Sequence, residues 1–119
     1  MNTHGKYGEV AVKAFEYMRS ELEASSAWER ASCEVFEKGS SSQTKGCPRN
    51  AFIGLVSDNP DAQKSKNAIY ALDALEILRS NPTRNYSKKE LWELAVGQPK
   101  KHNSQMDVVL ALWDNKLVN

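Results

Sequence analysis

The chain has 119 residues, of which 40% are hydrophobic and 26% are charged. This length fits one domain with a single core, and the composition is that of a globular rather than a disordered protein. With 16 basic and 15 acidic residues the net charge is +1, which excludes a global field that would attract nucleic acid or membrane. The sequence therefore predicts a single domain over residues 1–119.

No apolar run is long enough to span a bilayer, and the first ten residues, MNTHGKYGEV, lack the apolar core of a signal peptide. We therefore expect a soluble cytoplasmic protein that does not engage membranes. In that compartment the two cysteines, Cys33 and Cys47, are expected to be free thiols. The spacings between them and His4 and His102 match no zinc pattern, so we expect no metal. Nothing in the sequence indicates a cofactor.

Apolar residues at helical spacing predict helices along the chain, and no stretch alternates with the period of two that indicates a strand. The first helix is predicted over 6–24. Ser26 and Glu29 form a capping box, which predicts that the second helix begins at Ser26. Gly39, after a lysine, is a typical helix end.

A short and almost continuously apolar helix is predicted over 48–56, after a polar loop. Cys47 stands at the expected N-cap, and Pro48 is the first helical residue, where proline is favoured. The composition of this segment predicts that it is the most buried helix, around which the others pack.

Three more helices complete the predicted fold. The fourth spans about 65–79, with a predicted inner stripe of Ala68, Ile69, Leu72, Leu75 and Leu78. The fifth begins with a capping box and a hydrophobic staple and ends at a glycine: Ser87, Glu90, Tyr86, Leu91 and Gly97. The last begins at Asn103 or Ser104 and buries Met106, Val109, Leu110 and Trp113. We predict an all-α fold, a single compact domain of five to six helices around a short buried central helix.

Charge is distributed unevenly along the chain, with a net −2 over residues 1–38 and a net +2 over each of 39–66 and 84–119. Two basic segments lead into helix starts, where free backbone N–H groups attract anions. The candidate ligand-binding residues in these segments are Ser41, Ser42, Lys45, Cys47, Arg49, Lys100, Lys101, His102, Asn103 and Gln105. We expect the two segments to lie together as one basic face.

The alternative for the first segment is an ordered connector whose serines bond their own backbone. It is not a nucleotide-hydrolysing phosphate loop, because the Gly-Lys-Ser/Thr sequence and a preceding strand are both missing.

The sequence also suggests two other functions, cysteine-dependent catalysis and DNA binding. Cys47, between Lys45 and Arg49 at a helix start, has the surroundings that favour a thiolate, and His102 could serve as its base. Residues 87–116 resemble a helix-turn-helix, in which Asn103 and Gln105 would contact adenine. Against DNA binding, an aspartate lies in the first turn of the would-be recognition helix, and no basic arm follows.

The segments Ala27-Trp28-Glu29, GSSSQTKGCPRNAF and KKHNSQMDVVLALW resemble those of a family of small uncharacterised bacterial proteins, some of which look like products of mobile gene cassettes. The resemblance covers nearly the whole chain and implies a compact helical domain. It implies no activity, cofactor or catalytic residue. From the residues themselves we favour a binding module for an anionic small molecule or a partner protein. DNA binding is the alternative, a cysteine-dependent enzyme comes third, and we do not expect an enzyme.

Overall fold

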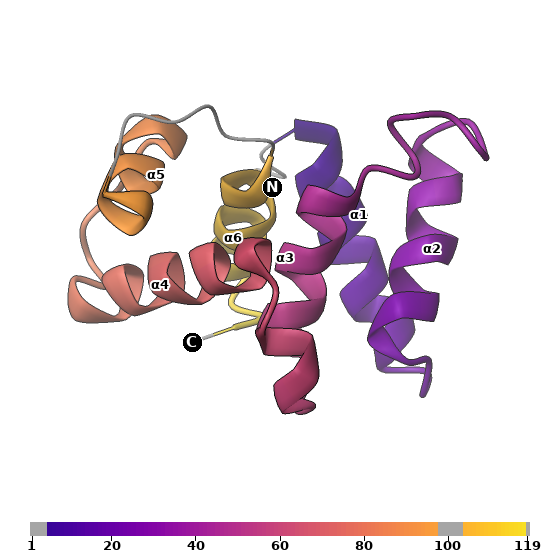
Figure 1. Ribbon diagram of the computed structural model, residues 1–119, viewed down its shortest axis with the longest axis horizontal. Coiled ribbons are helices and arrows are strands. Elements are labelled where there is room, and N and C mark those ends of the chain that lie inside the picture. Colours follow the sequence, from indigo (N-terminus) through magenta and orange to yellow (C-terminus); the bar gives the residue numbers. More distant parts are fainter. Residues whose placement is uncertain (1–4, 98–103, 119) are drawn as a thin grey trace.

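The computed structural model describes residues 5–97 and 104–118, and Figure 1 shows how the helices are arranged. Within these ranges the chain forms six α-helices and one short 3-10 helix, without a strand. They are α1 (Gly5–Met18), α2 (Ala24–Val35), α3 (Gly46–Val56), η1 (Pro60–Gln63), α4 (Lys66–Ser80), α5 (Lys88–Val96) and α6 (Gln105–Asp114). The predicted all-α fold is confirmed as one globule with a radius of gyration of 13.1 Å. None of the described helices has the length and apolar character needed to cross a membrane.

Helix α6 is the most buried of the described helices, because every residue from Gln105 to Leu112 is buried. Figure 1 shows α6 (yellow) in the middle of the molecule, between α5 on one side and α3 and α1 on the other, and α6 also contacts α4. A short central helix is therefore present, but our assignment of it to 48–56 is wrong. One side of α3 is open, since Ile53 and Val56 line a hollow at the surface. Apolar composition records a preference for the interior, whereas burial depends on how many neighbours surround a segment.

The core consists of two clusters of buried side chains. One lies among α1, α2 and α3 and includes Trp28 and Phe52, whose ring centroids are 5.3 Å apart. The other lies among α3, α4 and α5 and includes Leu78 and Trp92. Helix α6 contributes to both clusters: Val108 and Leu112 to the first, and Met106, Val109 and Leu110 to the second. It therefore joins the two halves of the molecule.

The fifth helix confirms its predicted start and end. The Ser87 hydroxyl oxygen accepts a hydrogen bond from the backbone N–H of Glu90 at 3.1 Å. Tyr86 and Leu91 are both buried, as a hydrophobic staple requires. Gly97 ends the helix with a left-handed φ of 75°. These local signals agree because each involves residues only a few positions apart.

The first two helices are present, but their predicted bounds are wrong. Helix α1 ends at Met18, earlier than predicted, and the turn that follows places Glu21 in the left-handed region with φ of 73°. Helix α2 begins at Ala24, with Glu23 as an N-cap that makes no side-chain hydrogen bond. Ser26 therefore lies within the first turn and does not cap the helix. The chain reverses here without the glycine that usually marks such a stop.

Two details of α3 and α4 also differ from the prediction. The N-cap of α3 is Lys45, so Cys47 and Pro48 are its second and third helical residues. Proline is tolerated there because the first N–H groups of a helix have no partner within it. In α4 the predicted inner residue Ile69 is 45% exposed, and small residues such as Ala71 face the core instead.

The cap at Ser87 generates the first prediction. Ser87→Ala should lower the free energy of unfolding by about 0.5–2 kcal/mol, because the N–H of Glu90 loses its acceptor. Ser26→Ala is the matched control and should change stability by less than about 0.5 kcal/mol, since no cap is lost. Denaturant unfolding of both variants measures the difference, and equal losses would contradict this account of the two helix starts.

Helices α3 and α4 approach closely at Gly54, which generates the second prediction. A Cβ on Gly54 would lie 2.3 Å from the Cβ of Ala68 and 2.9 Å from its Cα. Gly54→Ala should therefore destabilise the protein by about 1–3 kcal/mol, because the helices must move apart. Gly46→Ala is the control, since its Cβ would meet only the Asn50 side chain at 3.9 Å. Thermal unfolding that ranks the two variants the other way would refute the close approach.

Candidate functional site

The loop between α2 and α3 is held in place by hydrogen bonds among its own residues. The Ser40 hydroxyl accepts from the backbone N–H of Gln43 at 3.2 Å, and the Ser40 carbonyl accepts from the N–H and the hydroxyl of Thr44. The Gln43 side chain accepts from the N–H of Gly39 at 3.0 Å and donates to the buried Ser32 hydroxyl at 2.9 Å. The connector interpretation therefore describes this part of the loop well. Gln43, which we had not singled out, is its main anchor.

The loop is also fixed to α1. The Tyr7 hydroxyl donates to the carbonyl of Ser42 at 3.0 Å, and the Tyr7 ring lies 4.9 Å from that of Phe36, measured between centroids. The Lys45 ammonium lies 5.6 Å from the centre of the Tyr7 ring. The side chains of Ser41 and Ser42 stay exposed. Within an ordered loop, these two predicted ligand-binding hydroxyls remain accessible to solvent.

Arg49 lies at a surface hollow of about 220 Å³, which we call the Arg49 hollow. The other lining residues are Trp28, Glu29, Gln43 and Thr44. Arg49 is half-buried, and its guanidinium donates to the side chain of the adjacent Asn50 at 3.4 Å. No carboxylate of the described residues pairs with Arg49 or with Lys45, whereas the exposed Lys64 pairs with Asp61 at 3.0 Å. These two cations are therefore not neutralised by the described part of the fold.

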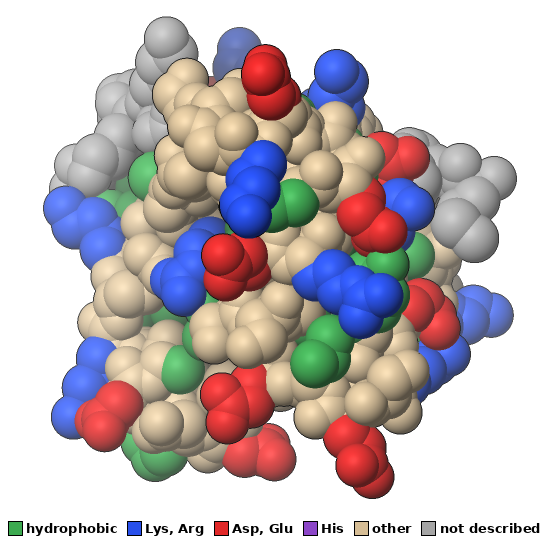
Figure 2. Space-filling view, turned by 90° about the vertical axis from the view of Figure 1, so that its right-hand side faces the viewer, with side chains coloured by type: hydrophobic (Ala, Val, Ile, Leu, Met, Phe, Trp, Pro, Cys, Tyr) green, Lys and Arg blue, Asp and Glu red, His purple; other side chains and the backbone are tan. Residues whose placement is uncertain are grey.

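The positive charge at this site is local. Figure 2 shows the side of the molecule that is on the right in Figure 1, where α2 lies, and its basic and acidic side chains are interspersed. Glu29, in the lining of the Arg49 hollow itself, is one of the acidic residues nearby. Any anion would thus be drawn by individual side chains and not by a broad basic surface.

The second predicted segment falls largely outside the described residues, since Lys100, Lys101, His102 and Asn103 all lie there. Its last member, Gln105, is buried and donates to the side chain of Asn67 on α4 at 2.8 Å. Whether the two basic segments meet thus stays a prediction. Helices α3 and α6 contact each other, and both begin on the upper side of Figure 1, as a shared face would require.

Neither cysteine forms a disulfide, and both are half-buried. Cys47 lies in the first turn of α3, as the nucleophile hypothesis requires, but the proposed base His102 is outside the described residues. The described residues contain no group of three or more His, Cys, Asp or Glu side chains able to hold a metal ion. The thiol therefore remains a candidate nucleophile without a described base.

The helix-turn-helix alternative conflicts with the position of α6. A recognition helix must expose one face to the major groove. Every residue of α6 from Gln105 to Leu112 is buried, and the Asp107 carboxylate forms an ion pair with Lys88 at 2.8 Å. Helix α6, which the alternative assigns to base recognition, therefore lies at the centre of the core.

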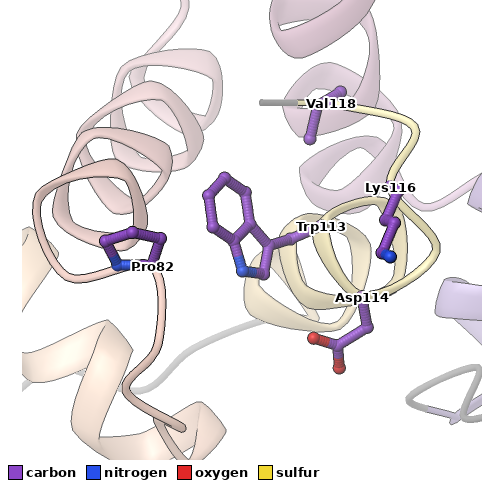
Figure 3. A pocket seen from close by; sticks show the side chains of 5 residues that line it. All are labelled: Pro82, Trp113, Asp114, Lys116 and Val118. Atoms are coloured by element: carbon purple, nitrogen blue, oxygen red, sulfur yellow. The ribbon is translucent and has the colours of Figure 1, made fainter.

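Another surface hollow lies at the end of α6, away from the residues that the sequence predicts to bind a ligand. This Trp113 hollow has a volume of about 390 Å³ and is lined by Pro82, Trp113, Asp114, Lys116 and Val118. Figure 3 shows the indole of Trp113 reaching from α6 toward Pro82, with Val118, Asp114 and Lys116 around it. A narrower cleft of about 130 Å³ shares three of these residues and reaches Arg84 and Tyr86. Trp113 had been predicted as core, but it is only half-buried.

Among the described residues, one ionisable side chain has a clearly shifted pKa. The Tyr17 hydroxyl donates to a carboxylate oxygen of Glu34 at 2.5 Å, and the Arg30 guanidinium lies 4.4 Å from the centre of the Tyr17 ring. The hydrogen bond to Glu34 raises the pKa of Tyr17 above its ordinary value of 10.0, because only the protonated hydroxyl can donate it. Tyr17 therefore stays a neutral phenol near pH 7 and is not a catalytic base there.

The Tyr17–Glu34 pair generates the third prediction. Its contribution to stability should be complete below about pH 10 and lost as the pH rises through the raised pKa of Tyr17, because the phenolate cannot donate. Glu34→Ala should bring the pKa of Tyr17 down toward 10.0. Glu37→Ala, an exposed carboxylate further along the chain, serves as the control. A carbon-13 NMR titration of Tyr17 that is identical in both variants would contradict the assigned cause.

The fold defines a small all-α protein with hollows at its surface. A family model matches residues 4–119, and the chain belongs to that family, described as Family of unknown function (DUF6979). The resemblance inferred from the sequence is thereby confirmed at the level of a family without an assigned activity. No curated protein and no solved structure matches the chain.

Proposed function

We propose that the chain is a small binding module that accepts an anionic group, carried by a small molecule or a partner protein, at the Arg49 hollow. The observation that supports this most directly is the half-buried Arg49, whose guanidinium has no carboxylate partner among the described residues. Partly buried cations normally have a counter-charge, because desolvation without one is unfavourable. An anion from a ligand would supply it through charge-assisted hydrogen bonds.

The surroundings of Arg49 favour the same role. The hollow lies at the first turn of α3, whose free N–H groups and positive helix end attract negative charge. The loop beside it is held by Gln43 and by the Tyr7 hydroxyl, so little order would have to be gained on binding. Lys45, at the N-cap of α3, is a second cation at this end of the helix, with its ammonium over the Tyr7 ring and outside the lining of the hollow.

Glu29 limits what the hollow accepts. Glu29 lines the same hollow, and its negative charge disfavours an anion that approaches from that side. A ligand with a single anionic group directed at Arg49 fits this arrangement better than a polyanion such as nucleic acid. The absence of a broad basic surface on the side shown in Figure 2 agrees with that preference.

Titration with inorganic phosphate, followed by the backbone amide NMR signals of α3, gives the fourth prediction. Phosphate should shift the signals of Gly46 and Cys47 in a saturable way. Arg49→Ala should weaken binding about tenfold, the effect of losing one charge-assisted hydrogen bond. Raised salt should weaken it further.

Two variants make this experiment specific. Glu29→Gln should strengthen phosphate binding, because it removes a repulsive charge while keeping the shape of the side chain. Arg79→Ala changes the net charge by the same amount as Arg49→Ala, at an exposed position on α4, and should leave binding unchanged. Equal effects of the two arginine variants would refute a site at Arg49 and reduce the interaction to net charge.

A further inference from the structure

The Trp113 hollow has its own pattern of charge, distinct from that of the Arg49 hollow. Three carbonyls at the end of α6, of which only that of Trp113 belongs to a residue lining the hollow, already accept hydrogen bonds. The Ala111 carbonyl accepts from the backbone N–H and from the side-chain amide of Asn115. The Leu112 carbonyl accepts from the N–H of Leu117, and the Trp113 carbonyl accepts from the N–H of Lys116. The negative end of this helix thus has few free acceptors left to bind a cation.

Of the described cations around this hollow, one has no carboxylate partner. Arg84 pairs with Glu90 at 2.6 Å, and its guanidinium lies over the Tyr86 ring. Asp114, which also lines the hollow, has an interaction of its own. Lys116 is exposed and has no carboxylate partner within residues 5–97 and 104–118. Its ammonium is therefore available to an anionic group of a ligand in this hollow.

Lys116 has a backbone conformation that glycine adopts more easily than lysine. Lys116 has φ of 59°, in the left-handed region, at the position after α6 where glycine is favoured. A side chain in this conformation costs about 1 kcal/mol relative to glycine. The chain therefore places an ammonium at the mouth of the hollow at some expense of stability.

The walls of the hollow are apolar and partly flat. The Trp113 indole and the Pro82 ring contribute such surfaces, and the volume of about 390 Å³ suits a small molecule. An aromatic ring gains free energy by stacking on an indole beyond the burial of its area. We propose that the Trp113 hollow binds a small planar aromatic carboxylate, with its ring against Trp113 and its carboxylate at the Lys116 ammonium. This site does not depend on the Arg49 hollow.

Benzoate is the probe, and the indole N–H signals in proton–nitrogen NMR are the readout. Benzoate should shift the Trp113 signal saturably, whereas the Trp92 signal, at 3% exposure, should stay unchanged. Any shift of the Trp28 signal reports the Arg49 hollow, which Trp28 lines, and should disappear in Arg49→Ala while the Trp113 shift remains. Benzylamine has the same ring with the opposite charge, and cyclohexanecarboxylate has the same charge without an aromatic ring. Both should bind at least about tenfold more weakly than benzoate, because each lacks one of the two interactions.

Lys116→Gly is the decisive variant, because glycine suits the left-handed backbone and the fold is expected to be retained or stabilised. It should weaken benzoate binding about tenfold, and Lys116→Arg should restore it. Lys89→Ala removes an exposed lysine from α5 and should have no effect.

Three outcomes would overturn the proposal. The first is benzoate binding that Lys116→Gly leaves unchanged. The second is equal binding of benzoate and benzylamine, which would reduce the hollow to a general apolar surface. The third is a shift of the Trp113 signal that depends on protein concentration without any ligand, which would assign the hollow to contact with a second copy of the chain.

Discussion

The burial of α6 on all sides is the constraint on which the rest of the structure depends. The helix has 10 residues, a length at which an isolated helix is marginal in water. It is stable here because α1, α3, α4 and α5 all contact it, and each covers part of its apolar surface. Since its side chains belong to both core clusters, neither half of the molecule could keep its packing without it. Helices α1, α3, α4 and α5 surround this central segment, and α2 packs against α1 and α3.

Placing a helix start in the interior requires that its polar groups have partners. Gln105 donates to Asn67, which ties the start of α6 to that of α4. The Asp107 carboxylate lies in the first turn, where the positive end of the helix favours it, and pairs with Lys88 in the first turn of α5. A buried carboxylate without such a partner would be strongly unfavourable. These two contacts therefore help to fix how α4 and α5 lie around the centre.

The two candidate sites lie at different ends of the fold and follow the same physical logic. The Arg49 hollow is beside the start of α3, whereas the Trp113 hollow is at the end of α6, near the C-terminus in Figure 1. At the Arg49 hollow neither Arg49 nor the nearby Lys45 has a carboxylate partner among the described residues, and at the Trp113 hollow Lys116 has none. Because the family carries no assigned activity, such charges that packing does not explain are the most direct guide to function.

Local chemistry in the sequence determined that the chain is all-α, and it located the start of α5 at Ser87 and its end at Gly97, because caps and staples involve residues within one or two turns. Only the tertiary structure decided which helix is central, since burial depends on neighbours that are distant in sequence. It also decided that Gln43 reaches back to α2 and that Trp113 borders solvent. Helical spacing places a side chain on one face of its own helix, but whether that face is covered depends on how the other helices pack against it.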